Sequence, residues 1–389
     1  MFWRSVSSFQ KFRRSYEDER TMRDDRLKIA MFGHKRIPSR DGGVEVVVGE
    51  LSSRMAALGH DVVCYNRGSA SMKQTVYQGV RLKTVLTIDK KGLAAVTSSF
   101  FAALAVAFSN ADVCHIHAEG PAFMSFLPKL FGKRVIVTVH GLDWQREKWQ
   151  SGFGAKYIRW GEKMAVRFAD EIIVLSRNVQ DYFLREYGRI THFISNGVSK
   201  PQKLLPDQIT VQFGLYGDDY ILFLGRLVPE KGVHHLIDAF MKTRTEKRLV
   251  IAGGSSDTDA YVENLKRQAE GDSRILFTGF VQGKLLEELY SNAYLYALPS
   301  DLEGMPLSLL EAMSYDNCCV VSDIPECTEV VENRAVQFHK GNAQSLQDTL
   351  QTLCNDSQMV EQYRESASAF ICEKYSWDDV VAKTLELYE

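Results

Sequence analysis

Two glutamates, Glu303 and Glu311, stand eight positions apart in the stretch DLEGMPLSLLEAMS, residues 301–314. The stretch follows an apolar strand and combines a glycine, a proline and several leucines, a pattern that predicts a turn leading into a buried helix. A helix buried in a core needs neither carboxylate. We therefore expect both acids to contact a ligand near the beginning of this helix.

The beginning of the predicted helix is a potential anion site. Pro306 suits the first turn, where its missing N–H costs nothing. The free backbone N–H groups near Gly304, Met305 and Leu307 would point at a ligand, and the helix dipole favours negative charge there. Gly304 also lets a ligand approach the backbone closely. A phosphate group fits these properties.

Two basic residues, Arg226 and Lys231, occur in the sequence GRLVPEKG, directly after the apolar strand 220–225. Arginine grips phosphate oxygens with a planar fork, and lysine acts as a compact point charge. Considered alone, this loop could equally be a solvated connection between a strand and a helix. Combined with the predicted helix start, it indicates a diphosphate held by two cations.

The two glutamates must then contact something other than the diphosphate, which would repel them. Glu311 follows Gly304 by about two helical turns and lies within roughly 20° of the same face, on the order of 10 Å along the axis. A nucleotide sugar suits that spacing, since it offers sugar hydroxyls at one end and ribose hydroxyls at the other. The alternative is that Glu303 interacts with the helix dipole and Glu311 is a surface acid.

The elements that position these residues alternate between apolar strands and helices. Near-continuous apolar strands of this kind predict parallel sheets covered on both faces. The predicted strands are 27–32, 61–66, 112–117, 134–140 and 171–176, then 220–225, 248–254, 274–280, 293–299 and 318–323. We therefore predict an α/β protein of two doubly wound Rossmann-like domains facing each other across a cleft, with ligands beyond the carboxyl ends of the strands.

The domain boundaries follow from where this rhythm stops. Prolines and glycines without a clear period predict a linker at 198–219. The first domain is predicted at 27–197, with a closing helix at 376–389, and the second at 220–375. Residues 1–26 form a basic and aromatic extension.

Composition excludes several classes of protein. The net charge of −2 gives no reason to expect nucleic-acid binding. The cysteine count, seven, is odd and contains no C-x-x-C pair, which indicates reduced, mostly buried thiols. The longest apolar run, 93–108, is shorter than a membrane span and is predicted to be a helix of the first domain.

The motifs resemble those of a known enzyme family. GRLVPEKG followed by EGMPLSLLEAM is similar to the E-x7-E signature of glycosyltransferase family 4, whose members are retaining enzymes with the GT-B fold. The resemblance covers nearly all of 27–389, including GGVEVVVGELSSRMAALGHDV, ISNGV and the terminal YSWDDVVAKTLELYE. The segment 140–149, HGLDWQREKW, resembles a subgroup in bacterial surface-polysaccharide synthesis that includes rhamnosyltransferase-like members.

This resemblance implies a role for each matching residue. Arg226 and Lys231 would bind the donor diphosphate, Glu303 the donor-sugar hydroxyls and Glu311 the ribose, while His140 would face and orient the reacting sugar. The expected catalytic residues are His140, Glu303, Arg226 and Lys231. The remaining expected donor-binding positions are Gly42, Gly43, Gly253, Gly254, Phe280, Val281, Gly304, Met305 and Leu307.

The expected activity is transfer of a hexose or deoxyhexose from a nucleotide-diphosphate sugar, with UDP or dTDP favoured, to a hydroxyl of a glycan or lipid-linked glycan. The second predicted domain would bind the donor and the first the acceptor. No cofactor or obligatory metal is expected, because the cationic groups are built into the chain. The alternatives are a nucleotide-sugar epimerase on the same fold and a non-catalytic sugar-nucleotide-binding partner.

Two further positions, His117 and Asp143, are expected on the acceptor side. His117 belongs to the sequence HIH, residues 115–117, which places two imidazoles on one face of a strand. Zinc binding, contact with the acceptor and a purely structural role all remain open for this pair. The D-x-D sequence at 257–259 resembles a metal site but is predicted to cap a helix.

Two basic and aromatic segments, 1–26 and 144–168, suit contact with an anionic membrane surface. The alternatives are an unstructured extension and a solvated helix. We expect a cytoplasmic enzyme, either free or peripheral on the inner face of the plasma membrane.

Overall fold

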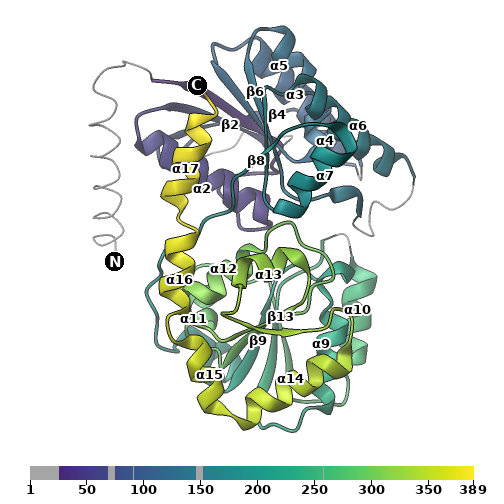
Figure 1. The fold of residues 1–389 in the computed structure, drawn as a ribbon, viewed down its shortest axis with the longest axis vertical. Coiled ribbons are helices and arrows are strands. Elements are labelled where there is room, and N and C mark those ends of the chain that lie inside the picture. The colour runs from purple at the N-terminus through teal and green to yellow at the C-terminus, as the bar shows by residue number, and fades with distance from the viewer. Residues whose placement is uncertain (1–25, 69–74, 91, 146–151, 257) are drawn as a thin grey trace. The chain divides into compact units, whose positions relative to one another are not determined.

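The computed structural model describes residues 26–68, 75–90, 92–145, 152–256 and 258–389, which form two compact units (Figure 1). Unit 1 contains the described residues up to Asn196 together with Trp377–Glu389, and unit 2 is Gly197–Ser376. The extension predicted at 1–26 lies, apart from its last residue, outside the described residues. Each unit contains a parallel sheet with helices around it, so the prediction of two doubly wound α/β domains is confirmed.

Unit 1 has one sheet in the described residues, in the order β3-β4-β2-β1-β5-β6-β7-β8. All neighbouring strands are parallel except the short β3–β4 pair. Its strands are β1 (Lys28–Phe32), β2 (Asp61–Arg67), β3 (Val76–Tyr77), β4 (Val80–Val85), β5 (Val113–His117), β6 (Arg134–Val139), β7 (Glu171–Val174) and β8 (His192–Phe193). Every residue of β5 is buried, as expected for a central parallel strand covered on both faces.

Helices connect these strands and cover the sheet. They are α2 (Gly43–Ala57), α3 (Leu93–Ala107), α4 (Glu119–Ala122), α5 (Phe126–Leu130), the 3-10 turn η1 (Asp143–Gln145), α6 (Gly152–Phe168), α7 (Arg177–Tyr187) and α17 (Trp377–Glu386). The last of these returns to unit 1 after unit 2 and is fixed to α2 by an ion pair of 2.6 Å between Arg54 Nη1 and Asp378 Oδ1.

Unit 2 has a sheet whose described strands are all parallel, in the order β11-β10-β9-β12-β13-β14. Its strands are β9 (Tyr220–Leu224), β10 (Arg248–Ala252), β11 (Ile275–Gly279), β12 (Leu295–Leu298), β13 (Cys319–Ser322) and β14 (Val336–Phe338). Counted from β9, this is the 3-2-1-4-5-6 order of dinucleotide-binding folds, and the strand order reverses between β9 and β12.

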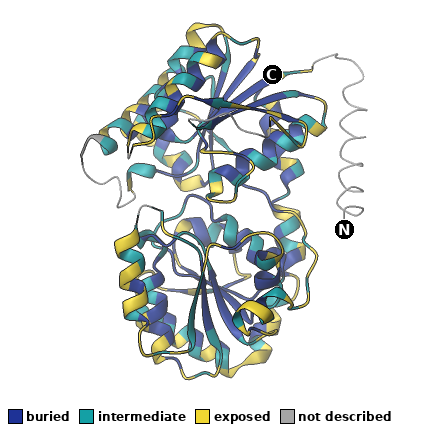
Figure 2. Ribbon diagram, turned by 180° about the vertical axis from the view of Figure 1, so that it is seen from behind, coloured by how far each residue is buried: buried dark blue, intermediate teal, exposed yellow. Residues whose placement is uncertain are grey.

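The helices of unit 2 follow the same alternation. They are α8 (Gln208–Phe213), the 3-10 turn η3 (Pro229–Lys231), α9 (Val233–Lys242), α10 (Asp259–Gln268), α11 (Lys284–Ser291), α12 (Leu307–Ser314), α13 (Pro325–Val331), α14 (Ala343–Asn355), α15 (Ser357–Arg364) and α16 (Ala367–Lys374). Figure 2 shows that the central strands of both sheets are buried while the outer faces of many helices are exposed. The predicted linker contains α8 and belongs to unit 2.

The apolar run at 93–108 forms α3. The buried side of this helix includes two serines, and one of its phenylalanines is exposed. Ser98 and Ser99 are buried and donate to the Ala95 carbonyl, whereas Phe100 is 41% exposed. Small residues face the sheet because they allow the helix to approach it closely. Among the described residues, no helix has the length and hydropathy needed to cross a bilayer. The seven cysteines are unpaired, and five of them are buried.

Candidate active site

The candidate residues of unit 2 lie where its strand order reverses. The loop after β9 and the loop after β12 are joined here, because the Asp301 N–H donates to the Glu230 carbonyl at 2.8 Å. Gly232 permits this contact: it has a φ of +64°, and a Cβ at its position would lie 2.0 Å from the Pro299 carbonyl oxygen. Ligands of doubly wound sheets bind at such a reversal.

The most tightly held charges at this edge are Lys231 and Glu303. Lys231 Nζ lies 2.5 Å from Glu303 Oε1, and the two side chains are 13% and 8% exposed. Ser300 Oγ donates to the same carboxylate oxygen at 2.6 Å. Arg226 is half-buried on the loop that also carries Lys231. Lys231, predicted to bind phosphate, and Glu303, predicted to bind the sugar, are therefore neighbours. In this structure they form an ion pair with each other.

The helix predicted to bind phosphate is α12, which begins at Leu307. Pro306 is its N-cap residue, with extended backbone, and its carbonyl accepts from the N–H groups of Leu309 and Leu310 at 3.1 and 3.3 Å. The N–H groups of Leu307 and Ser308 have no helical partner, because they belong to the first turn. Gly304 and Met305, which precede the helix, are buried.

Glu311 lies on the second turn of α12 and is held by a tyrosine that sequence analysis did not identify. Tyr290 Oη donates to Glu311 Oε2 at 3.1 Å, and Tyr296 Oη donates to Ser308 Oγ at 2.8 Å. Both tyrosine rings are fully buried. Two tyrosines in and around an apolar strand were a usable signal, since a buried phenol needs a hydrogen-bond partner.

Four of the expected donor-binding residues, Gly253, Gly254, Phe280 and Val281, follow the carboxyl ends of β10 and β11. The Gly253 N–H donates to the Gly279 carbonyl at 2.9 Å, and the Leu227 N–H donates to the Gly254 carbonyl at 2.9 Å. A Cβ on Gly253 would lie 1.8 Å from the Gly225 carbonyl oxygen. Beside these glycines, the Phe280 side chain is 51% exposed and Val281 is buried, so one apolar ring is available to a ligand.

In unit 1, His140 follows β6 and contacts His117 at the end of β5. His117 Nδ1 and His140 Nε2 are 3.1 Å apart, and the rings are tilted by 30°. His117 is fully buried, whereas His140 is half-buried. His117 therefore lies under His140 and contacts it, rather than lying at the surface.

Two other imidazoles share this environment. His115 Nε2 lies 2.7 Å from Thr138 Oγ1, and its Nδ1 lies 2.6 Å from Tyr388 Oη. Burial lowers the pKa of His115 to about 3 and that of His34 to about 4, and it lowers the pKa of His117 well below the ordinary value. These imidazoles are neutral at pH 7. The described residues contain no group of side chains able to hold a metal ion.

Gly42 and Gly43 lie at the beginning of α2, where the chain already provides a negative charge. The buried Glu45 accepts from the Lys35 N–H at 2.8 Å through Oε1, and a Cβ on Gly42 would lie 2.6 Å from Glu45 Oε2. A phosphate approaching these glycines would meet this carboxylate as well as the backbone amides.

Asp143 begins the turn η1, which is attached to a buried acidic pair. Its N–H donates to Glu119 Oε2 at 2.8 Å, and the Trp144 indole donates to Glu162 Oε2 at 3.2 Å. Burial first, and then the charge of Asp143, raises the pKa of Glu119 well above its ordinary value. Burial therefore favours the protonated form of Glu119, whose carboxyl oxygen fixes the segment after His140. Sequence analysis missed it, although an acid in an apolar context was a signal.

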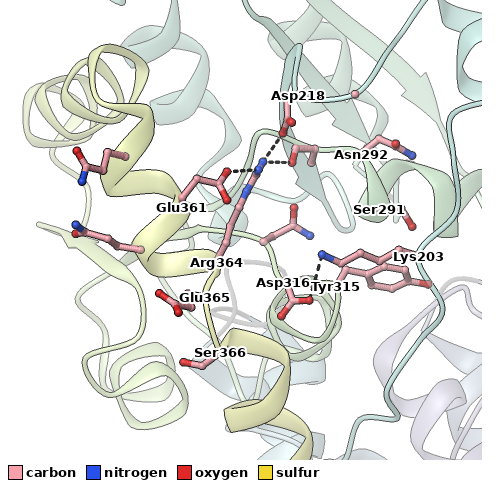
Figure 3. Close-up of a pocket in the computed structure, with 15 residues that line it drawn as sticks. Lys203, Asp218, Ser291, Asn292, Tyr315, Asp316, Glu361, Arg364, Glu365 and Ser366 are labelled. Atoms are coloured by element: carbon pink, nitrogen blue, oxygen red, sulfur yellow. Dashed lines mark hydrogen bonds and ion pairs between the residues drawn. The ribbon is translucent and has the colours of Figure 1, made fainter.

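A cavity of about 620 Å³ lies elsewhere in unit 2, at the amino ends of its strands (Figure 3). Arg364 is bound there by Asp218 and Glu361, and Lys203 Nζ lies 3.1 Å from Asp316 Oδ2. The candidate donor residues lie at the opposite, carboxyl edge, and none of them lines this cavity. These five charged side chains pair with one another.

Comparison with known proteins identifies the family of both units. Residues 41–200 match the family model described as glycosyltransferase family 4, and residues 208–383 match the model described as glycosyl transferases group 1. Alpha-maltose-1-phosphate synthase of Mycobacterium tuberculosis is 26% identical over 93% of this chain and 99% of its own. O-antigen chain mannosyltransferase B of Escherichia coli is 27% identical over 49% of this chain and 50% of its own.

Solved structures resemble the whole fold. Sucrose-phosphate synthase of Thermosynechococcus elongatus has a TM-score of 0.81 and 21% identity, covering 93% of this chain and 98% of the other. HepE of Anabaena in complex with UDP-glucose has a TM-score of 0.77 and 19% identity, covering 92% and 99%. The family models match both units, and the Mycobacterium tuberculosis relative and both solved structures align along more than nine tenths of the chain: this protein belongs to the family 4 glycosyltransferases and has the GT-B fold.

Proposed function

We propose that the protein transfers a sugar from a nucleotide-diphosphate donor, with UDP or dTDP favoured, to a hydroxyl of a glycan or lipid-linked glycan in cell-surface polysaccharide synthesis. The observation that supports this most directly is the Lys231–Glu303 pair beside the first turn of α12. A cation, a carboxylate that can accept a hydrogen bond from a hydroxyl, and the backbone N–H groups of the first turn of α12 lie together where the strand order reverses.

In this proposal, the donor separates the two members of the pair. Lys231, Arg226 and the N–H groups at the start of α12 bind the diphosphate, and Glu303 accepts from a hydroxyl of the sugar. Glu311, braced by Tyr290, accepts from the ribose. Phe280 provides an apolar surface for the base. Each carboxylate then accepts a hydrogen bond from a neutral hydroxyl, and the phosphates contact the positively charged side chains.

The transfer breaks the bond between the anomeric carbon and the diphosphate oxygen and forms a bond from that carbon to the acceptor oxygen. The negative charge that develops on the leaving diphosphate is stabilised by Arg226, Lys231 and α12. The acceptor attacks the face from which the leaving group departs, so the configuration is retained. The hydroxyl proton passes to the leaving phosphate. His140 orients the sugar.

The names of similar proteins support the choice of substrates. One solved structure of the same fold holds UDP-glucose, and two relatives are O-antigen chain mannosyltransferases. A nucleotide sugar as donor and a surface glycan as acceptor fit both observations and the HGLDWQREKW segment.

The test is thermal unfolding of the full chain in the presence of UDP-, dTDP-, GDP- and ADP-sugars, followed by transfer assays with the donor that binds. A ligand of the native state raises the melting temperature. We expect one base to give the largest shift, and a product whose anomeric configuration, read by NMR, matches the donor. Conversion of the donor without an acceptor would contradict transfer and favour an epimerase, and an inverted product would contradict retention.

The proposed acceptor is carried at a membrane surface, and α6 is the described element best suited to contact one. Its exposed side chains are basic or aromatic: Lys156, Arg159, Trp160, Lys163 and Arg167. We expect the protein to sediment with anionic vesicles and not with neutral ones. The double variant Lys156→Glu, Lys163→Glu should weaken sedimentation, whereas Lys266→Glu on α10 should not. Recovery in the supernatant with both vesicles would refute membrane contact.

A further inference from the structure

Two imidazoles of unit 1 share one hydrogen bond, and its direction has chemical consequences. His117 Nδ1 faces His140 Nε2 at 3.1 Å. Two neutral imidazoles can share such a bond only if one nitrogen carries the proton and the other offers a lone pair. The choice also decides which nitrogen of His140 carries its proton, because a neutral ring has one.

The His117 ring is packed so that it cannot easily turn toward another hydrogen-bond partner. It stacks on His115, with centroids 4.2 Å apart and planes 29° apart. His115 is in turn fixed on both sides by Thr138 and Tyr388. The His117 backbone is equally confined, because a Cβ on Gly33 would lie 2.1 Å from its carbonyl oxygen. The His117 ring is therefore packed in one orientation.

The second nitrogen of His117 indicates the direction of the bond. His117 Nε2 is buried and has no hydrogen-bond partner among the described residues. A proton on Nε2 would leave a buried donor unsatisfied, which native structures rarely tolerate. A proton on Nδ1 leaves only a bare lone pair at Nε2 and places the donor toward His140.

A neighbouring histidine shows the same solution. His34 Nε2 lies 2.8 Å from Asn66 Oδ1, and Asn66 Nδ2 already donates to the Ile37 carbonyl. His34 must therefore donate through Nε2, which leaves its buried Nδ1 as a bare lone pair without a partner in the described chain. His34 is thus a buried imidazole whose one unsatisfied nitrogen is an acceptor and not a donor.

We propose that His117 is a positioning residue that donates its Nδ1–H to His140 Nε2 and thereby holds His140 in the Nδ1–H form. In this form His140 presents a hydrogen-bond donor, and its lone pair is occupied by His117. His140 then donates to an oxygen of the reacting sugar and does not act as the base. The statement about the sugar rests on the proposed function, whereas the statement about the protons does not.

The protons can be read directly in the unliganded full chain. Nitrogen-15 NMR of histidine-labelled protein distinguishes protonated from bare ring nitrogens, and His140→Asn and His117→Asn assign the two rings among the nine histidines. We expect the wild type at pH 7.5 to show a bare Nε2 and a protonated Nδ1 at His140. A protonated Nε2 at His140 would overturn the proposal, whether or not the enzyme transfers sugar.

A second measurement uses variants that differ at one atom position. His117→Asn can place a side-chain N–H near the position of Nδ1, whereas His117→Asp offers only acceptors there and should draw a proton onto His140 Nε2. We expect His117→Asp to lower kcat by about tenfold to a hundredfold with little change in donor KM. His117→Asn should retain more kcat, with the wild-type protonation at His140.

A variant of the neighbouring His115 and a comparison of melting temperatures distinguish the effect of hydrogen-bond direction from effects of packing. His115→Asn alters the same stack without touching the His117–His140 bond, so it should not change the protonation of His140. If His117→Asp and His117→Asn melt alike and have equal kcat, the positioning role is wrong. If no donor is turned over by the wild type, the proposed function fails, and the NMR result still decides the proposal about the protons.

Discussion

The two units share a sheet pattern but use different chemistry at the same place. In unit 2, the reversal between β9 and β12 carries a paired cation and carboxylate, Lys231 and Glu303. In unit 1, the strand order reverses between β1 and β5. His117 lies at the end of β5 and His140 follows the neighbouring strand β6. His117 is buried and neutral. The comparison shows that one architecture accommodates either paired charges or neutral polar rings. Unit 2 should therefore be sensitive to the removal of one charge, and unit 1 to acid pH.

The largest expected effect comes from breaking the charged pair in unit 2. Glu303→Ala should lower transfer on the order of a thousandfold, since it removes the sugar contact and leaves Lys231 unpaired. It should also lower the free energy of unfolding by about 3–5 kcal/mol, because a buried charge loses its partner. Steady-state kinetics and urea unfolding measure the two effects.

The double variant Lys231→Met, Glu303→Gln is the control for this prediction. It removes both charges, so stability should largely return while transfer stays lost. Unchanged turnover in Glu303→Ala would show that the carboxylate has no role in the reaction, and the comparison between the units would lose its basis.

The next effect is a loss of stability of unit 1 at acid pH. Buried His34, His115 and His117 have folded-state pKa values below the ordinary value, so the unfolded chain binds protons that the native chain does not. The stability is fully present above about pH 6.5 and falls as the pH decreases, by about 1.4 kcal/mol per pH unit for each such imidazole. For His34 this loss continues to about pH 4 and for His115 to about pH 3.

Tryptophan fluorescence can assign this loss to unit 1. All five tryptophans lie in the sequence ranges of unit 1, at positions 3, 144, 149, 160 and 377, and none lies in 197–376. Urea unfolding between pH 5 and 6.5 should therefore give a fluorescence midpoint that rises with pH. His115→Asn should reduce the slope. A midpoint independent of pH would mean that the imidazoles are not held neutral.

A smaller effect of opposite sign is expected from Glu119. Its folded-state pKa is raised, so the native chain retains a proton that the unfolded chain releases above about pH 4.5. Stability from this group is lost as the pH rises. Glu119→Gln keeps an acceptor for the Asp143 N–H and removes the titration, so unit 1 should gain about 1–3 kcal/mol at pH 8 relative to pH 5. Equal pH profiles for both proteins would show that Glu119 is ionised.

The smallest effect tests the brace on α12. Tyr290→Phe removes the hydroxyl that donates to Glu311 at 3.1 Å and keeps the ring. The loss of one hydrogen bond to a charged group corresponds to about 1.5–3 kcal/mol at most, and we expect the lower end because Glu311 is half-buried. Donor KM should rise while kcat is unchanged. A fall in kcat alone would place Tyr290 in the transfer step instead.

Much of the fold was predictable because apolar strands and helices differ in period. The strands that precede Lys231, Glu303 and His140 are where the sequence predicts them, and the family that the motifs resemble is confirmed by the matching family models. Pro306 was predicted in the first turn of this helix, but it is the N-cap residue of α12.

The contacts within the site were not predictable. Lys231 and Glu303 are 72 residues apart, and their pairing depends on Gly232 fitting against the Pro299 carbonyl. His117 was predicted on the acceptor side, but only the relative stagger of β5 and β6 shows that it lies under His140. Such contacts are set by loop geometry and strand register, which local sequence patterns do not encode.

The return of α17 to unit 1 affects the order in which the chain can fold. Unit 1 begins before unit 2 and receives its last helix, with the Tyr388 phenol that supports His115, only after residues 197–376 have been synthesised. The sequence of unit 2 is thus complete before that of unit 1, which differs from the usual order in which an N-terminal domain folds first. Without α17 the histidine stack lacks one of its supports, so a chain that ends at residue 376 should contain a native unit 2 and an incomplete unit 1.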